Sequence, residues 1–224
     1  MIIYYQDKQI IVCEKPAGIL SQPGEASLPG EDMISLLTGE CGGEIHPVHR
    51  LDRGVGGIMV YARSAQAAAA LDRAIAGREF TKEYLCVCHG RPDQPSGEMR
   101  DLLFHDQVRG KTFPADRIRR GVKEALLDYR LLDSAGEFSL VRVRLHTGRT
   151  HQIRAQFSFR HLPLAGDGKY GAKDHFRQIA LHSCRIAFAH PAKGRPPVDL
   201  TSLPDFSTEP WAAFAQTEIK EMES

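Results

Sequence analysis

The stretch from His49 to Arg53 restricts the fold of this chain more than any other, because it concentrates charge and is followed by glycine. Asp52 stands between two arginines, and glycines occupy positions 54, 56 and 57 ahead of the apolar run 58–61. Glycine lacks a Cβ, so the backbone can turn sharply there and a ligand can come close to it. A neighbouring guanidinium favours the ionised form of a carboxyl group. The stretch therefore predicts a loop that presents Asp52 as a base or a nucleophile; the alternative is a solvated surface ion pair.

The length and composition of the chain favour one domain over several. Its 224 residues are 42% hydrophobic and 25% charged, which suits a substantial core in a single domain spanning 1–224. The N-terminus lacks the pattern of a signal peptide, and no apolar run approaches the roughly 18 residues of a membrane span. Five cysteines, an odd number, fit reduced thiols better than a disulfide framework. We therefore expect a cytoplasmic protein that does not enter a membrane and is a monomer.

The distribution of charge is more informative than the net charge of +1. Between residues 100 and 123, seven lysines and arginines stand against three aspartates, a surplus of four positive charges. A second basic group, with Glu137 as its only close acid, consists of Arg142, Arg144, Arg149 and Arg154. Clustered cations on a nearly neutral protein predict a surface for phosphates, and the alternative is an ordinary solvated surface.

Short apolar runs predict the secondary structure. The runs at 2–5, 10–13, 80–87 and 138–145 are typical of strands. Ser64 is expected to cap a helix over the alanine-rich residues 65–76, and a shorter helix is expected at 32–37. Residues 90–120 are expected to be rich in loops. This pattern predicts an α+β protein with a central mixed, mostly antiparallel sheet flanked by helices and loops.

Two further stretches carry polar side chains that chemistry could use. In the strand 80–87, Lys82 and Tyr84 share a face, although a tyrosine in a strand is more often part of a core. After the strand 138–145 comes a glycine turn and then a helical pattern over 149–157, which would direct backbone N–H groups at an anion. On that helix, His151 and Arg154 are three residues apart and therefore neighbours. The simpler role of Arg154 is a structural ion pair.

These stretches together resemble the RluA-type pseudouridine synthases, which modify RNA. The resemblance extends over about residues 5–200, and its motifs occur in the family order. They are K-P-x-G at 15–18, H-R-L-D at 49–52, K-x-Y at 82–84, T-G-R-x-H-Q-I-R at 147–154, G-D-x-x-Y-G at 166–171, and the closing L-H at 181–182 with H-P at 190–191. The resemblance implies the pseudouridine synthase catalytic fold, a structured RNA (ribosomal or transfer RNA) as partner, and no cofactor.

The resemblance also implies roles for individual residues. Asp52 would be the catalytic carboxylate, Arg154 would pair with it, and Tyr84 would stack on the target base. Arg50 would occupy the place that the flipped uridine leaves, and Leu181 would pack against the flipped base. The other positions expected to contact substrate are His49, Arg149 and Lys82. Whether Asp52 attacks C1′, adds at C6 or removes the 2′ proton stays open.

The chain departs from the family in two respects. Val55 and Gly56 stand where the family usually has Thr and Ser, which puts a hydroxyl contact near Asp52 in doubt. The S4-type RNA-binding module of many relatives is not expected, because only about fifty residues precede Asp52.

Two other functions fit the sequence less well. A metal-dependent phosphoesterase would need paired ligands, but the ten histidines show no H-E-x-x-H or similar spacing. Cys86 and Cys88 could bind a metal, although such residues are usually small buried hydrophobes. No metal site is therefore expected. A noncatalytic RNA-binding or RNA-folding protein that retains the fold is the second alternative.

Overall fold

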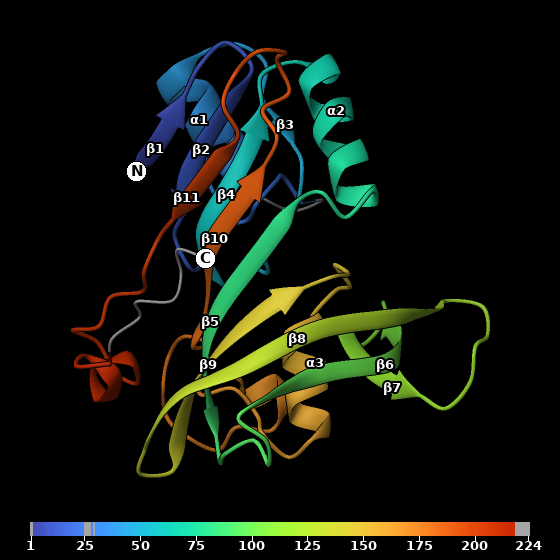
Figure 1. Cartoon of the computed structure of the whole chain (residues 1–224), viewed down its shortest axis with the longest axis vertical. Coiled ribbons are helices and arrows are strands. Elements are labelled where there is room, and N and C mark those ends of the chain that lie inside the picture. Colours follow the sequence, from blue (N-terminus) through green and yellow to red (C-terminus); the bar gives the residue numbers. More distant parts are fainter. Residues whose placement is uncertain (1, 25–27, 29, 218–224) are drawn as a thin grey trace. The chain divides into compact units, whose positions relative to one another are not determined.

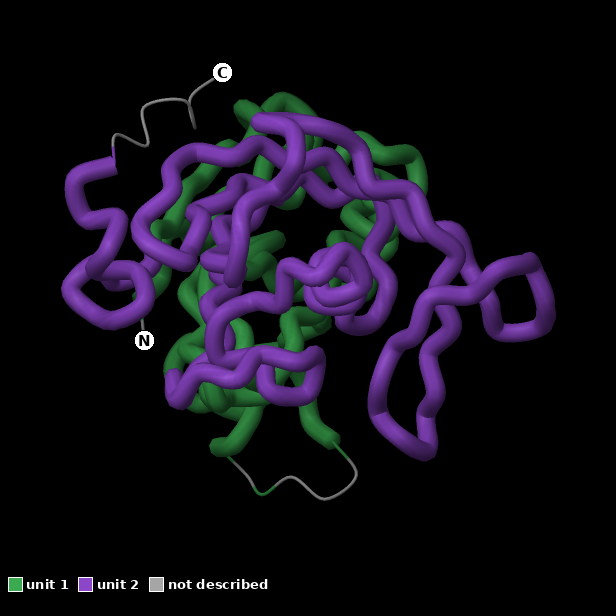
Figure 2. Tube along the Cα trace, turned by 90° about the horizontal axis from the view of Figure 1, so that it is seen from below, with its two compact units in different colours: residues 1–82, 183–203 green, residues 83–182, 204–224 purple. Residues whose placement is uncertain are grey.

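The computed structural model describes residues 2–24, 28 and 30–217, and the chain forms two compact units. Unit 1 contains residues 1–82 and 183–203, and unit 2 contains residues 83–182 and 204–224 (Figure 2). The expectation of a single domain over 1–224 stays a prediction.

Unit 1 is built on short strands with two helices. Its strands are β1 (Ile3–Gln6), β2 (Ile10–Lys15), β3 (His46–Pro47), β4 (Gly56–Ala62), β10 (Leu181–Phe188, within the unit from Ser183) and β11 (Val198–Thr201). They lie in the order β1-β2-β4-β10, with β11 beside β10 and β3 beside β4 (Figure 1). The pairs β1/β2, β2/β4, β3/β4 and β10/β11 are antiparallel.

The two helices of unit 1 begin where the sequence predicts them. In α2 (Ala65–Ala76), the side chain of Ser64 accepts a hydrogen bond from the Ala67 N–H, as an N-cap should. Ala67 and Leu71 are buried in one cluster with Ile58 of β4, so α2 covers this part of the sheet. α1 (Met33–Cys41) is capped by Asp32 in the same way and runs beyond the predicted end at 37.

Unit 2 is an antiparallel sheet with one helix against it. Its strands are β5 (Thr81–His89, within the unit from Glu83), β6 (Ser96–Asp106), β7 (Lys111–Ala115), β8 (Val122–Ala135) and β9 (Phe138–Leu145), in the spatial order β5-β9-β8-β6-β7. The helix α3 (Gln152–Phe159) packs on β6 and β7. Two short 3-10 helices, Gly168–Tyr170 and Trp211–Phe214, complete the unit.

The prediction of a loop-rich segment at 90–120 is wrong, because β6 and β7 form a long hairpin there. In β6, Met99 and Leu103 are buried on the face that Asp101 shares, where Asp101 accepts hydrogen bonds from Gln156 and Arg160, whereas Arg100 is exposed on the other face. These charges hid the alternation in the sequence. The predicted α+β class with a mostly antiparallel sheet is confirmed.

Gly57 allows β4 to approach the neighbouring strand closely. Its φ is +118°, a conformation that side chains disfavour, and a Cβ there would lie 2.3 Å from the carbonyl oxygen of Ser183. The hydroxyl of Ser183 donates a 2.9 Å hydrogen bond to the carbonyl of Ile58, which holds the two strands together at this point. The backbone that leads out of the Asp52 loop therefore depends on a glycine.

Gly57→Ala should destabilise the protein by about 2–4 kcal/mol, because it adds both backbone strain and a clash with backbone atoms. Urea unfolding measures this. Gly39→Ala is the matched control: Gly39 lies within α1 with nothing near its would-be Cβ, so the change should stabilise by about 0.5–1 kcal/mol. Equal effects of the two substitutions would contradict this account of Gly57.

Candidate active site

The Asp52 loop is attached to the core of unit 1 on both sides of the carboxylate. Leu51 and Val55 are 8% and 2% exposed, whereas Asp52 between them is only half-buried. The hydroxyl of Ser21 accepts from the Leu51 N–H at 3.0 Å and donates to the Leu51 carbonyl at 2.9 Å. The Val55 N–H donates to the carbonyl of Asp52 and closes a turn. The fold therefore fixes the backbone of Asp52 while leaving its side chain near the surface.

The burial of Val55 gives the departure from the family pattern a structural reason. An apolar side chain at this position fills the core, so valine anchors the loop by packing. Gly56, the second departure, begins β4, and a Cβ there would lie 3.4 Å from backbone atoms of Lys15 and Ala17.

Lys15 holds this loop from within the core. Its side chain is 0% exposed, and Nζ donates to the carbonyls of Pro16 at 2.9 Å, Ile19 at 2.7 Å and Arg53 at 3.4 Å. Three acceptors match the three N–H groups of an ammonium. Burial lowers the pKa of Lys15 to about 8, and the carboxylate of Asp52 opposes that shift. The lysine of the K-P-x-G motif thus bonds from the core to the loop that carries Asp52, the predicted catalytic residue.

Two further hydrogen bonds join the Asp52 loop to the segment that follows Lys15. The Gly18 N–H donates to the carbonyl of Arg53 at 2.7 Å, and Nε of Arg53 donates to the carbonyl of Gly18 at 2.9 Å. Arg53, an exposed residue, therefore pairs with backbone here. Arg50 is also exposed, as its predicted contact with RNA requires.

His49 is directed into unit 1. Its Nε2 accepts from the Val60 N–H at 3.3 Å, and its ring lies 5.7 Å from that of Phe80. Burial, with a smaller contribution from Lys82, lowers the pKa of His49 to about 3, so the imidazole is neutral. We infer from the Val60 bond that the ring proton is on Nδ1, which is buried and has no hydrogen-bond partner among the described residues. This geometry makes His49 a support of the loop, and its predicted contact with substrate stays a prediction.

The strand β5 carries the predicted pair Lys82 and Tyr84. Both side chains are largely buried, at 9% and 5% exposed, and burial lowers the pKa of Lys82. Leu181, at the start of β10, is 6% exposed. Arg149 lies ahead of α3, where its Nε donates to the carbonyl of Glu124. The predicted roles of these residues toward RNA stay predictions.

Arg154 is held by a residue to which the sequence assigned no role. Asp167 receives Nε and Nη2 of Arg154 at 2.7 and 2.8 Å, a bidentate pair in which the two side chains are 7% and 1% exposed. The ring of Tyr170 lies 5.0 Å from the guanidinium carbon. The hydroxyl of Tyr170 also pairs with Nδ1 of His151 at 3.0 Å. The G-D-x-x-Y-G motif, which contains Asp167 and Tyr170, was the signal that could have identified both.

The backbone at the start of α3 is unusual. His151 has a φ of +56° and lies in the left-handed region, which a residue other than glycine adopts at a cost of about 1 kcal/mol or more. Its bond to Tyr170 holds it there. The helical pattern predicted from 149 therefore begins at Gln152, after this turn.

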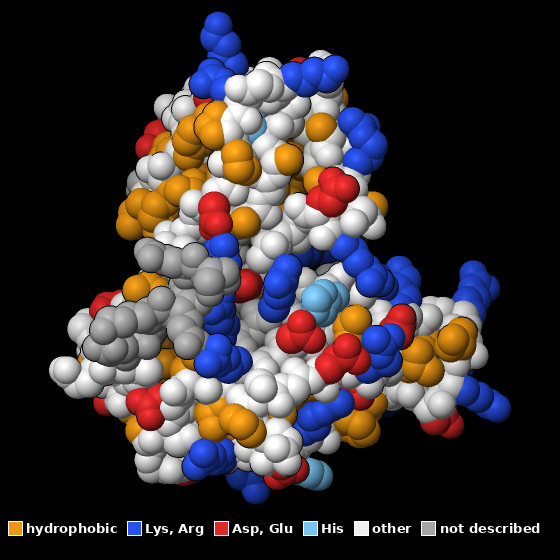
Figure 3. All heavy atoms as spheres, in the orientation of Figure 1, with side chains coloured by type: hydrophobic (Ala, Val, Ile, Leu, Met, Phe, Trp, Pro, Cys, Tyr) orange, Lys and Arg blue, Asp and Glu red, His pale blue; other side chains and the backbone are white. Residues whose placement is uncertain are grey.

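The predicted basic surface is neutralised in part by ion pairs between strands. Arg142 pairs with Glu83, and Arg100 pairs with Glu98 and Glu124. Figure 3 shows the same mixture, with acidic side chains interspersed among lysines and arginines on the visible face. Arg117 and Arg120 are exposed, and within the described residues they make no ion pair. The loop 116–121 thus keeps positive charge, and the exposed Lys123 and Arg144 also make no ion pair within the part of the chain that the structure describes.

The residues that the structure describes contain neither a cluster of metal ligands nor a membrane-spanning helix. No three His, Cys, Asp or Glu side chains among them gather as a metal ion would require. None of their helices combines the length and apolarity needed to cross a membrane.

The fold is that of pseudouridylate synthase domains. A solved structure, Human RNA Pseudouridylate Synthase Domain Containing 4, aligns with a TM-score of 0.75 and 23% identity over 95% of this chain and 90% of that one. A second, Human RNA Pseudouridylate Synthase Domain Containing 1, gives a TM-score of 0.76 at 22% identity over 92% and 84%. At this level of identity the likeness shows the fold.

The sequence comparisons establish the family. The family model described as RNA pseudouridylate synthase matches residues 9–159. An uncharacterized RNA pseudouridine synthase of Chloroflexus aurantiacus is 36% identical over 81% of this chain and 59% of its own length. The YlyB protein of Bacillus subtilis, also an uncharacterized RNA pseudouridine synthase, is 31% identical over 86% and 65%. The ribosomal large subunit pseudouridine synthase D of Xanthomonas campestris is 32% identical over 87% and 63%.

The chain belongs to the RNA pseudouridine synthase family, and the predicted resemblance is confirmed. It spans between 59% and 65% of the length of these three relatives.

Lys15→Met should destabilise the protein by about 1–3 kcal/mol, because the carbonyl groups of Pro16, Ile19 and Arg53 lose their hydrogen bonds from Nζ. It should also reduce activity beyond what the lost stability explains, since the Asp52 loop loses its support. Urea unfolding and turnover at a temperature where both proteins are folded measure the two effects. Lys8→Met, at an exposed position, is the control. A Lys15→Met protein as stable as the control would contradict this account.

His49 should make stability depend on pH. Its pKa is near 6.5 when unfolded and about 3 when folded. Between these values the unfolded state binds more protons, so stability falls as the pH falls, by at most about 1.4 kcal/mol per pH unit.

His49→Gln keeps a polar group near the Val60 N–H but does not titrate. Between pH 7 and pH 5 the wild type should therefore lose about 2 kcal/mol more than this variant in urea unfolding. His161→Asn, at an exposed position with a φ of +59° that asparagine tolerates, should behave as the wild type. Parallel losses in wild type and His49→Gln would show that His49 does not remain neutral in the fold.

Proposed function

We propose that this protein is an RNA pseudouridine synthase that isomerises uridine to pseudouridine, with Asp52 as the catalytic carboxylate. One observation carries the proposal: the H-R-L-D loop is anchored by Leu51 and Val55 and supported by Lys15, while Asp52 itself stays near the surface. A carboxylate held in this way is preorganised to act on a bound substrate. Membership of the family and the names of the relatives support the same activity.

The reaction is an isomerisation, so it requires no redox partner. The bond between N1 and C1′ breaks, the uracil rotates, and a bond forms between C5 and C1′. C5 then loses its proton and N1 gains one, which leaves the composition unchanged. A carboxylate can start this by attack at C1′, by addition at C6 or by removing the 2′ proton. All three routes require the Asp52 carboxylate to reach the flipped nucleotide.

Arg154 is proposed to pair with Asp52 and to keep it ionised. A guanidinium has five N–H donors, and Asp167 receives two of them, from Nε and Nη2. The proposed pair with Asp52 would use another edge of the same planar group. Asp167 and Tyr170 would then act as positioning residues, because they fix the plane of the guanidinium and not the substrate.

The remaining residues would receive the uridine. Removing it from its helix costs a few kcal/mol, and Arg50 is proposed to occupy the space it leaves. Tyr84 and Leu181 are proposed to pack on the uracil. Arg149 and Lys82 are proposed to contact the RNA backbone, while His49 acts in this site through the loop that it supports.

Ribosomal RNA is the substrate we propose, because several related proteins are named ribosomal large subunit pseudouridine synthase D. Transfer RNA is the alternative substrate. A cytoplasmic location and a monomeric state stay predictions. Phosphate contacts would make binding weaken steeply with salt.

Asp52→Asn should reduce pseudouridine formation by at least about 10²-fold, because it removes the charge while keeping the shape. The substrate for this test is ribosomal RNA from cells that lack the protein, and mapping pseudouridine before and after incubation measures the product. RNA binding should stay within a few-fold of wild type. Asp72→Asn, at an exposed position on α2, should be fully active.

The outcomes separate the proposal from its alternative. Undiminished activity of Asp52→Asn would reject Asp52 as the catalytic group. Wild-type protein that binds the RNA tightly yet forms no pseudouridine in ribosomal or transfer RNA would favour the noncatalytic RNA-binding role.

A further inference from the structure

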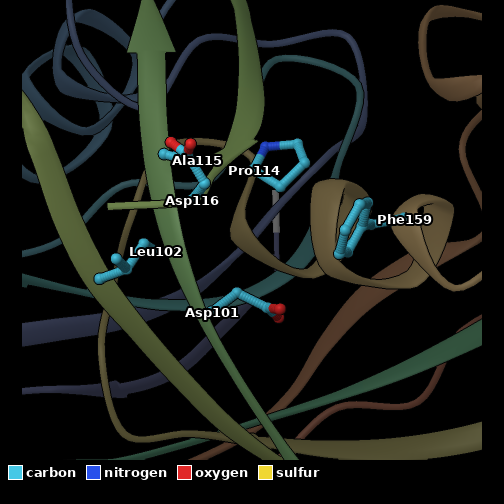
Figure 4. A pocket seen from close by; sticks show the side chains of 6 residues that line it. All are labelled: Asp101, Leu102, Pro114, Ala115, Asp116 and Phe159. Carbon is cyan, nitrogen blue, oxygen red and sulfur yellow. The ribbon is translucent and has the colours of Figure 1, made fainter. Parts of the chain in front are cut away.

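A pocket of about 290 Å³ opens in unit 2 beside the end of α3 that is remote from Arg154. Its walls come from β6, β7 with the residue that follows it, and the last residue of α3: Asp101, Leu102, Pro114, Ala115, Asp116 and Phe159. Figure 4 shows the rings of Phe159 and Pro114 on facing sides of this pocket, with the side chain of Asp101 extending below them. At the small end of the range for ligand pockets, this volume suits one planar ring system.

Phe159 is unusual for an aromatic residue on a packed helix. It is 55% exposed, whereas Phe157, two residues earlier, is fully buried. The two side chains point to different faces of α3, so the ring of Phe159 contributes little to the core. An exposed phenylalanine at a pocket offers a π-face to a ligand, and every nucleobase can stack on it.

The pocket also offers two carboxylates as hydrogen-bond acceptors, one buried in contacts and one exposed. Asp101 is held in place by Nη1 of Arg160 at 2.9 Å and by Nε2 of Gln156 at 2.7 Å, so its charge is compensated and its position is fixed. Asp116 is exposed at the rim, directly after β7. Carboxylate oxygens at these positions suit a ligand with N–H donors, such as the exocyclic amino group of a base.

The surroundings favour RNA over a protein ligand. Asp116 begins the loop 116–121, in which Arg117, Arg119 and Arg120 are exposed. Arg119 lies over the ring of Phe104, and the other two make no ion pair within the described residues. Three cations next to an aromatic pocket match the phosphates that flank a base, whereas they would repel a basic peptide drawn to Asp101 and Asp116.

We propose that this pocket binds one unpaired base of the substrate RNA outside the reacting uridine. The base stacks on Phe159 and carries an exocyclic amino group, as adenine, cytosine and guanine do, which donates to Asp116. Arg117 and Arg120 bind the neighbouring phosphates. This inference rests on the proposed function, because it assumes that RNA is the substrate.

The pocket would give the enzyme a second position at which it recognises a base, in addition to the reacting uridine. Phe159 and Arg154 are five residues apart on α3, which is about 7.5 Å along a helix axis. A base held by Phe159 would therefore place the RNA strand at a fixed distance from the arginine proposed to pair with Asp52. Sequence preference at this position follows from the amino group, which uracil lacks.

Phe159→Trp provides a direct reporter, because the chain has a single tryptophan, the buried Trp211. Hexamers of adenylate, cytidylate, guanylate and uridylate are titrated into this variant and into wild type. Stacking should quench the fluorescence of the new tryptophan, and the uridylate hexamer should bind at least about fivefold more weakly than the cytidylate hexamer. Asp116→Ala should abolish that difference while quenching persists.

Turnover supplies a second measurement. Phe159→Ala should raise KM for ribosomal RNA about 5- to 100-fold, the range expected for the loss of one base stack, and leave kcat within twofold. Leu203→Ala, which truncates another half-exposed side chain outside the pocket, should change neither. Because Phe159 is exposed, its truncation should leave the unfolding midpoint unchanged.

The failure of this inference differs from the failure of the proposed function. An active wild type whose Phe159→Trp variant shows no quenching with any hexamer, or whose Phe159→Ala variant keeps a wild-type KM, overturns the pocket alone. Quenching by an arginine-rich peptide but by no hexamer also overturns it, in favour of a protein ligand. A wild type inactive on ribosomal and transfer RNA overturns the activity.

Discussion

The site depends on one buried ammonium group. Lys15 donates to three carbonyl groups from two segments, residues 16–19 and the Asp52 loop, and it does so with no exposure to solvent. The cost of burying a cation is offset here because every donor has an acceptor and the Asp52 carboxylate is near. The loop is thus held by charge from inside and by Leu51 and Val55 through packing. A catalytic carboxylate on a loop gains from this rigid support, because misplacement by about 1 Å is costly in rate.

Arg154 has a comparable support in unit 2. Asp167 and Tyr170 surround its guanidinium, and the bond from Tyr170 to His151 fixes the strained turn at which α3 begins. The same helix ends at Phe159, beside the pocket proposed to bind a base. One rigid element thus connects the residue proposed to pair with the carboxylate and the residue proposed to read the RNA. Arg100 and Arg142 are paired with glutamates, so the exposed arginines of the loop 116–121 would contribute to the affinity for phosphates.

The sequence predicted the parts of this molecule that local patterns determine. The cap at Ser64, the α2 helix and the strands 10–13 and 138–145 follow from neighbouring residues, and the family followed from motifs. The hairpin of β6 and β7 was missed because charged residues interrupt its apolar positions. Asp167 was missed as a partner of Arg154, and the burial of His49 was not foreseen, because such contacts depend on residues distant in the chain. The sequence at Val55 indicates a lost hydroxyl, whereas the burial of its side chain shows that it anchors the loop by packing.

The most direct test of the central claim is a crystal structure of the Asp52→Asn variant bound to an RNA that contains the target uridine. The account predicts an unstacked uridine whose C1′ or C6 atom lies about 3–3.5 Å from the residue 52 side chain, with the Arg154 guanidinium on the other side of that side chain. A uridine bound elsewhere on the protein, with residue 52 directed away from any nucleotide, would contradict it.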